Sequence, residues 1–72
     1  MLRLPIDSSV IAAMGYDPAS AVLEIEFRTS GYVYRYFGVP AGEYRAFLEA
    51  SSKGAYLDEH FKKAGYRYKR LS

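Results

Sequence analysis

The sequence contains no cysteine and no tryptophan, and it has a single histidine among 72 residues. The lack of cysteine excludes disulfides, thiolate metal sites and cysteine nucleophiles, and it is compatible with the cytoplasm, where we expect the protein. One histidine without converging ligands predicts neither a metal site nor a cofactor. Long apolar runs are also missing: the longest covers residues 10–16, whereas a membrane-spanning helix needs about 20 residues. We therefore expect no membrane or targeting segment.

The length predicts a single domain over residues 1–72, with an ordered core at 8–70, and we expect a monomer. A chain of this size buries only about 60% of the surface that its unfolded form exposes. Eight tyrosines and four phenylalanines must therefore either supply the core or form a stacking surface. Because a ligand cleft of about 300 Å³ or more is difficult to build in so small a domain, an enzyme is not expected.

The net charge of +2 is distributed unevenly along the chain. Residues 1–61 carry five Lys/Arg and eight Asp/Glu, whereas residues 62–72 carry five Lys/Arg and no acid. A basic end on an otherwise acidic domain suggests an anionic partner, and the alternative is a solvated surface.

The first half of the chain has the alternation of β-strands. Apolar and polar residues alternate clearly over 23–28, less so over 10–16, and residues 32–37 are rich in strand-forming aromatic and β-branched types. A two-residue loop at Ser30-Gly31 would place Phe27 opposite Tyr34 and Ile25 opposite Tyr36. That register puts both tyrosines on the core face, and it puts Glu26 opposite Arg35 on the other face.

The second half has the periodicity of helices. Tyr44, Phe47 and Leu48 form one apolar stripe within residues 41–50. A second stripe, which places a half-buried His60 between Leu57 and Phe61, ends at Gly65. Residues 66–70 alternate tyrosine with basic residues, as in a short edge strand with Tyr66 and Tyr68 inward. The sequence therefore predicts an α+β fold: a three-stranded antiparallel meander, two helices on one face, and a short C-terminal edge strand.

An ordered set of short motifs carries a family resemblance. These are Ser8-Ser9, Gly15-Tyr16-Asp17, Leu23-x-Ile25-x-Phe27, Gly31-x-x-Tyr34-x-Tyr36-x-x-Val39-Pro40, Ala50-x-Ser52-x-Gly54-x-Tyr56 and Tyr66-x-Tyr68. With them, residues 8–70 resemble the KTSC domain, a small domain that occurs at the C-terminus of some lysyl-tRNA synthetases and in short bacterial or phage proteins. The resemblance implies a nucleic-acid-binding module with RNA as its partner, and it brings no catalytic residues.

Two groups of residues are candidate binding sites. Ser52, Lys53 and Gly54 open the second predicted helix and suit a phosphate, whereas the simpler alternative is a helix cap followed by a sharp turn. The basic end could follow a phosphate backbone while nearby tyrosines stack on unpaired bases. The full set of nucleic-acid-binding candidates is Lys53, Lys62, Lys63, Arg67, Lys69, Arg70, Tyr56 and Tyr68.

The sequence supports two classes of function. The first is a nucleic-acid-binding accessory module without catalytic activity. The second is a protein-interaction or self-association module that uses the aromatic surface or an open sheet edge.

Overall fold

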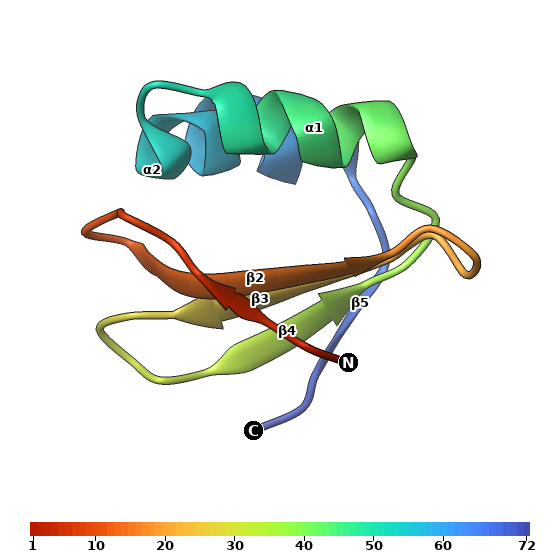
Figure 1. Cartoon of the computed structure of the whole chain (residues 1–72), viewed down its shortest axis with the longest axis horizontal. Helices are drawn as coiled ribbons and strands as arrows, with labels where there is room; N and C mark the ends of the chain where they lie inside the picture. Colours follow the sequence, from red (N-terminus) through yellow and green to blue (C-terminus); the bar gives the residue numbers. More distant parts are fainter.

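A computed structural model describes residues 1–72 as an antiparallel sheet covered on one face by helices (Figure 1). The elements are β1 (Leu4–Pro5), β2 (Ile11–Asp17), β3 (Val22–Phe27), β4 (Val33–Tyr36), α1 (Ala41–Glu49), α2 (Lys53–Tyr56), η1 (Leu57–Phe61), η2 (Lys62–Ala64) and β5 (Tyr68–Arg70). The five strands lie in the order β1-β2-β3-β4-β5, so each strand pairs with its neighbour in sequence. The second helix, α2, continues into a π-helical turn, η1, and then into a 3-10 turn, η2.

The α+β class and the placement of the helices on one face are confirmed, but the predicted three-stranded meander undercounts the sheet. The expected meander corresponds to β2, β3 and β4, and the expected edge strand is β5. The additional strand is β1, which pairs Leu4 with Met14. Two residues, one of them Pro5, are too few to show an alternating pattern in the sequence.

The β3–β4 hairpin has a longer loop than the sequence predicts. The observed pairs are Leu23 with Tyr36 and Ile25 with Tyr34, a shift of two residues from the expected register. The loop is longer because Arg28 leaves the hairpin: its backbone N–H donates to the Val10 carbonyl at 2.9 Å, and its guanidinium reaches neighbouring carbonyls of the β1–β2 connection. A shift of two keeps every side chain on its predicted face.

The core lies between the helical layer and the inner face of the sheet. A β-bulge in β2 lets Ile11 and Met14 both face inward, which replaces the regular alternation that the sequence suggests. Phe47 of α1 and Phe61 of η1 are fully buried against this face, whereas Leu48 is 39% exposed, so the predicted stripe on α1 is narrower than expected. The buried cluster is Ile11, Met14, Leu23, Ile25, Tyr36, Val39, Phe47, Leu57 and Phe61.

The N-terminal segment crosses the outer face of the sheet. Gly15 makes this crossing possible, because a Cβ at that position would collide with the carbonyl oxygen of Leu2. The segment brings Arg3 onto Glu24 in the central strand, where the carboxylate is 2% exposed. Arg35 completes the arrangement from β4, with two hydrogen bonds to Glu24 at 2.9 and 2.6 Å. The partner of Arg35 is therefore Glu24 and not Glu26, as the two-residue register shift requires.

Both ends of the second helical segment follow the sequence signals. The Ser52 side chain accepts a hydrogen bond from the Ala55 N–H at 3.2 Å, which caps α2. Gly65 adopts a left-handed conformation with φ of 76° and ends the segment after Ala64. The chain then descends from the helical layer to the sheet edge, where β5 pairs with β4 (Figure 1).

Candidate nucleic-acid interface

The helical layer leaves part of the inner sheet face uncovered at β4 and β5. Phe61 is the last helical ring over the sheet, and it meets Tyr36 edge-on at 4.8 Å. Beyond it a cleft of about 350 Å³, larger than the sequence leads us to expect for so small a domain, opens between the helix end and strands β4 and β5. Its lining is almost entirely aromatic and includes one cation: Tyr34, Tyr36, Phe61, Lys62, Tyr66 and Tyr68. This region, the β4–β5 cleft, is the candidate site.

Two tyrosines at the mouth of the cleft are stacked on each other. Tyr34 and Tyr68 lie on adjacent strands with ring centroids 5.3 Å apart and planes 12° from parallel. One face of the Tyr68 ring is covered by Tyr34, yet the side chain is 61% exposed. An aromatic ring fixed on one side and open on the other is a preformed place for a further planar group. The sequence predicts that Tyr68 faces inward. Its pairing with the buried Tyr36 on the adjacent strand confirms that it lies on the inner face of the sheet.

Cations surround this aromatic surface. The Arg70 guanidinium lies 4.3 Å from the centroid of the Tyr32 ring, and the Arg67 guanidinium lies 6.0 Å from that of Phe37. Neither arginine forms a salt bridge. Lys62 pairs only with Asp58 at 3.2 Å, and both side chains are more than half exposed, so the pair is weak. The surface next to the cleft therefore carries two arginines that form no salt bridge, and the cleft itself carries Lys62 in a weak pair with Asp58.

The other predicted residues lie elsewhere. Lys69 pairs in register with Arg35 on the outer face of the sheet, opposite to the cleft. Lys53 belongs to α2, at the left end of the helical layer in Figure 1, whereas the chain leaves that layer toward β5 at the right. Lys63 is exposed on η2 and forms no salt bridge. Tyr56 is half-buried against Phe47 within the helical layer, with ring centroids 4.8 Å apart.

The three candidates for an anion site have partners within the chain. Ser52 caps α2, and the Lys53 ammonium donates to the Ala50 carbonyl at 2.8 Å. Gly54 lies so close to Val10 that a Cβ there would be 2.8 Å from its Cγ2 atom. The capping alternative accounts for these contacts, and the anion site stays a prediction.

A buried carboxylate joins the helices to the segment before β5. Glu43 of α1 accepts hydrogen bonds from the hydroxyls of Tyr56 and Tyr66, and its Oε2 lies 3.4 Å from Nε2 of His60. Burial, followed by the hydrogen bond to Glu43, raises the pKa of Tyr56 and of Tyr66 to about 12. The two phenols donate to one carboxylate of α1 and so link it to α2 and to the segment before β5. His60 is 62% exposed beside Glu43, more than its predicted half-buried position on the apolar stripe.

Tyr32 and Tyr34 are the site residues that sequence reasoning did not assign to an interface. The sequence provides no assignment for Tyr32, and it predicts Tyr34 in the core because Tyr34 follows the inward alternation of β4. Both do face inward, but the helical layer ends before it reaches them. One signal for this exposed surface was available in the sequence. The helical half of the chain is short, and so few helical residues cannot cover a sheet of five strands.

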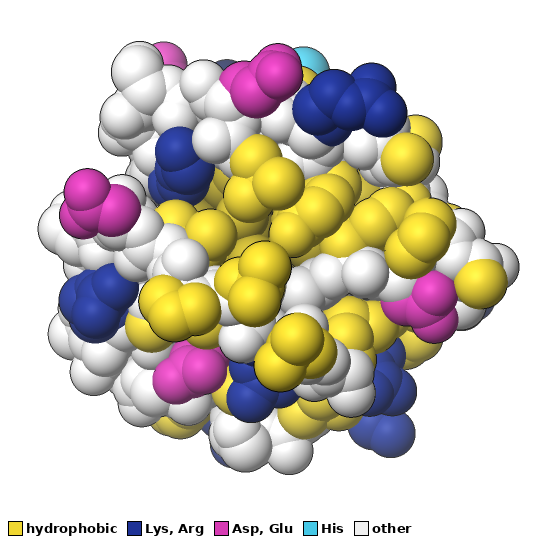
Figure 2. Space-filling view, viewed as in Figure 1, with side chains coloured by type: hydrophobic (Ala, Val, Ile, Leu, Met, Phe, Trp, Pro, Cys, Tyr) yellow, Lys and Arg dark blue, Asp and Glu magenta, His cyan; other side chains and the backbone are white.

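Figure 2 shows one face of the molecule, where apolar side chains gather across the middle and charged groups lie mainly around the periphery. The N-terminal segment contributes to the apolar surface of the molecule, since Leu2 and Leu4 are largely exposed.

No three histidine, aspartate or glutamate side chains come together as a metal site would require. No helix is long and apolar enough to cross a membrane.

Fold and motifs together define a small α+β domain with an aromatic cleft at its last two strands, and the chain belongs to the KTSC domain family. The family profile matches residues 7–68. An uncharacterised protein of Stutzerimonas stutzeri strain A1501 is 44% identical over 71 residues, which is 99% of either chain. A protein of Tsukamurella paurometabola is 41% identical over 54 residues, covering 75% of this chain and 79% of its own.

A solved structure shares the whole fold. The crystal structure of a KTSC domain protein from Yersinia pestis has a TM-score of 0.89 and 38% sequence identity to this chain. The match covers 99% of this chain and 97% of that one.

Proposed function

We propose that this KTSC domain is a non-catalytic nucleic-acid-binding module of the cytoplasm, that its partner is RNA, and that the β4–β5 cleft is the contact surface. The observation that carries the proposal is the exposed Tyr68 ring in the cleft, with the unpaired cation Arg67 in the adjoining hollow and the unpaired cation Arg70 two residues further along β5. Cations hold phosphates, and an open aromatic ring stacks on a base. The choice of RNA follows from the occurrence of similar domains beside lysyl-tRNA synthetases.

The outer face is less suited to a polyanion, although it also carries arginines. Arg3 and Arg35 both bind the buried carboxylate of Glu24, and Arg3 lies 3.6 Å from Glu26 as well. Their charge is thus largely neutralised within the chain. No carboxylate lines the cleft, although the buried Glu43 accepts a hydrogen bond from the hydroxyl of Tyr66, one of the lining residues.

Two adjacent residues of β5 allow a matched test. Arg70 lies on the cleft face and Lys69 on the outer face, so neutralising either removes one charge from the same strand. Titrating fluorescein-labelled oligouridylate while following its anisotropy, we expect Arg70→Gln to weaken binding several-fold more than Lys69→Gln. If Lys62, Arg67 and Arg70 each meet one phosphate, log K should fall with log salt at a slope of about −2.

Two results contradict the proposal. One is the absence of binding to any oligonucleotide at low salt, and the other is an affinity that does not change with salt. A larger effect of Lys69→Gln would move the interface to the outer face.

The exposure of Leu2 and Leu4 favours a second candidate, a protein-interaction module. Strand addition at a sheet edge is not the preferred mode, since β1 contains Pro5 and β5 carries Lys69 and Arg70, which oppose pairing with a second copy. Light scattering separates the two candidates: an apolar contact makes a dimer that persists at high salt, whereas a nucleic-acid module remains monomeric without its ligand.

A further inference from the structure

The β4–β5 cleft is the middle part of a longer track. A second hollow, of about 230 Å³, lies beside Tyr32 and shares Tyr34 with the cleft. A third lies between Phe37 and Tyr68 and shares Tyr68 with it. Because neighbouring hollows share wall residues, the three lie next to one another from the Ser30 turn, along β4, to Phe37, and we refer to them together as the track.

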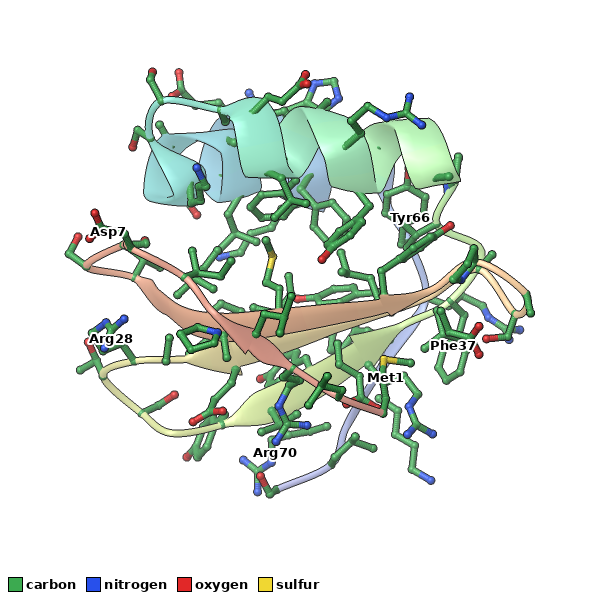
Figure 3. All side chains as sticks on the ribbon, in the orientation of Figure 1. Met1, Asp7, Arg28, Phe37, Tyr66 and Arg70 are labelled. Carbon is green, nitrogen blue, oxygen red and sulfur yellow. The ribbon has the colours of Figure 1, made fainter.

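Each part of this track has aromatic walls and a cation of its own. Arg70 lies over Tyr32, which lines the first hollow, Lys62 lines both the first and the middle hollow, and Arg67 lies beside Phe37 in the third (Figure 3 labels Arg70 and Phe37). An arginine whose plane lies against an aromatic ring still has N–H donors at its edge for a phosphate oxygen. The track thus repeats one unit, an aromatic wall with a cation, along the strand direction.

We infer that the ligand of this track is single-stranded nucleic acid, whose unpaired bases stack on the tyrosines while its phosphates meet the three cations. This inference rests on the proposed function and specifies its ligand. In a duplex both faces of each base are already covered by neighbouring pairs, so no base face is free to stack on a tyrosine. An unpaired base can instead add to the open face of Tyr68, a contact worth about 1–3 kcal/mol.

The stacking surface is held in place by contacts between rings of the chain itself. Tyr34 supports Tyr68 from one side with nearly parallel rings, and the tilted Tyr36 ring lies 5.6 Å from Tyr68 on another. Fixing the ring beforehand lowers the conformational entropy lost on binding. Because every base has a π-face, the track should tolerate many sequences.

The test compares labelled oligouridylate alone with the same strand annealed to oligoadenylate, by anisotropy at one low salt concentration. We expect the single strand to bind at least ten times more tightly. Tyr68→Leu should weaken single-strand binding by roughly 5- to 150-fold, which is the stacking energy converted to affinity, and should leave duplex binding unchanged. Tyr68→Phe keeps the ring and serves as the matched control. Since Tyr68 is exposed, neither variant should unfold the protein, as circular dichroism can verify.

The outcomes separate this inference from the proposed function. Equal affinity for both forms, or an affinity for the single strand that Tyr68→Leu leaves unchanged, overturns the single-strand inference while the proposed function stands on its charge dependence. Failure to bind either form overturns both and leaves the track as a surface for a protein ligand.

Discussion

Replacing Glu24 with glutamine should destabilise the fold more than any other single carboxylate change. The carboxylate is 2% exposed and accepts hydrogen bonds from Arg3 at 2.9 Å and from Arg35 at 2.9 and 2.6 Å. Hydrogen bonds to charged groups contribute about 1.5–3 kcal/mol each when shielded from water. Because both arginines are about one-third exposed, solvent screens part of this interaction, and we expect a total loss of about 2 kcal/mol.

The assay is thermal unfolding followed by circular dichroism. A loss of about 2 kcal/mol in a domain of this size lowers Tm by roughly 8–16 °C. Glu49→Gln is the matched control, because Glu49 is exposed and forms no salt bridge, and it should change stability by less than about 0.5 kcal/mol. Equal Tm values for the two variants would refute the reasoning. A double-mutant cycle with Arg35→Gln then isolates the coupling between the two groups.

The same carboxylate predicts a pH dependence. Burial raises the pKa of Glu24, but the hydrogen bonds and charges of Arg35 and Arg3 outweigh it, so the net pKa is lowered from 4.5. A lowered folded-state pKa gives stability that is present above pH 4.5 and is lost as the pH falls through the folded-state value. The difference in stability between wild type and Glu24→Gln should therefore shrink on acidification below pH 4.5. A difference that stays constant down to strongly acidic pH would contradict this.

Three further predictions concern packing and titration. Gly15→Ala should destabilise by about 1–3 kcal/mol because its Cβ meets the crossing N-terminal segment, whereas Gly42→Ala, in open space on α1, should stabilise by about 0.5–1 kcal/mol in urea unfolding. Phe47→Ala should cost about 3–5 kcal/mol in the same assay. The raised pKa of Tyr66, about 12, contributes stability that is complete below pH 10 and is lost as the pH rises toward 12. Tyr66→Phe should accordingly lose less stability than wild type over that interval, and phenolate absorbance should show one fewer late-titrating group.

Local patterns predicted the faces of the sheet but not its extent. The alternation in β3 and β4 correctly placed Ile25, Tyr34 and Tyr36 inward, because the two-residue period survives a register shift of two. The loop length depended on a tertiary contact, the anchoring of Arg28 to the β1–β2 connection, which no local pattern reveals. The sequence does not predict β1, because a strand of two residues shows no periodicity.

The candidate residues that lie near one another in the structure are those that adjoin in sequence. Lys62 and Tyr68 line the cleft, Arg67 lines the hollow next to it, and Arg70 follows Tyr68 on β5. Tyr56 adjoined the basic end in sequence, but the helical segment turns it toward Glu43. The contributions of Tyr32 and Tyr34 depend on where the helical layer stops, which is a property of the packed molecule.

The most direct test of the account is a nuclear magnetic resonance titration with oligouridylate that follows two arginine side chains. Arg70 marks the β4–β5 cleft and Arg35 marks the outer face, where Glu24 already holds it. The account predicts that the Arg70 Nε signal and the ring signals of Tyr68 shift progressively with added RNA while the Arg35 Nε signal stays in place. Shifts confined to Arg35, or no shift at either arginine, would contradict a nucleic-acid interface in this cleft.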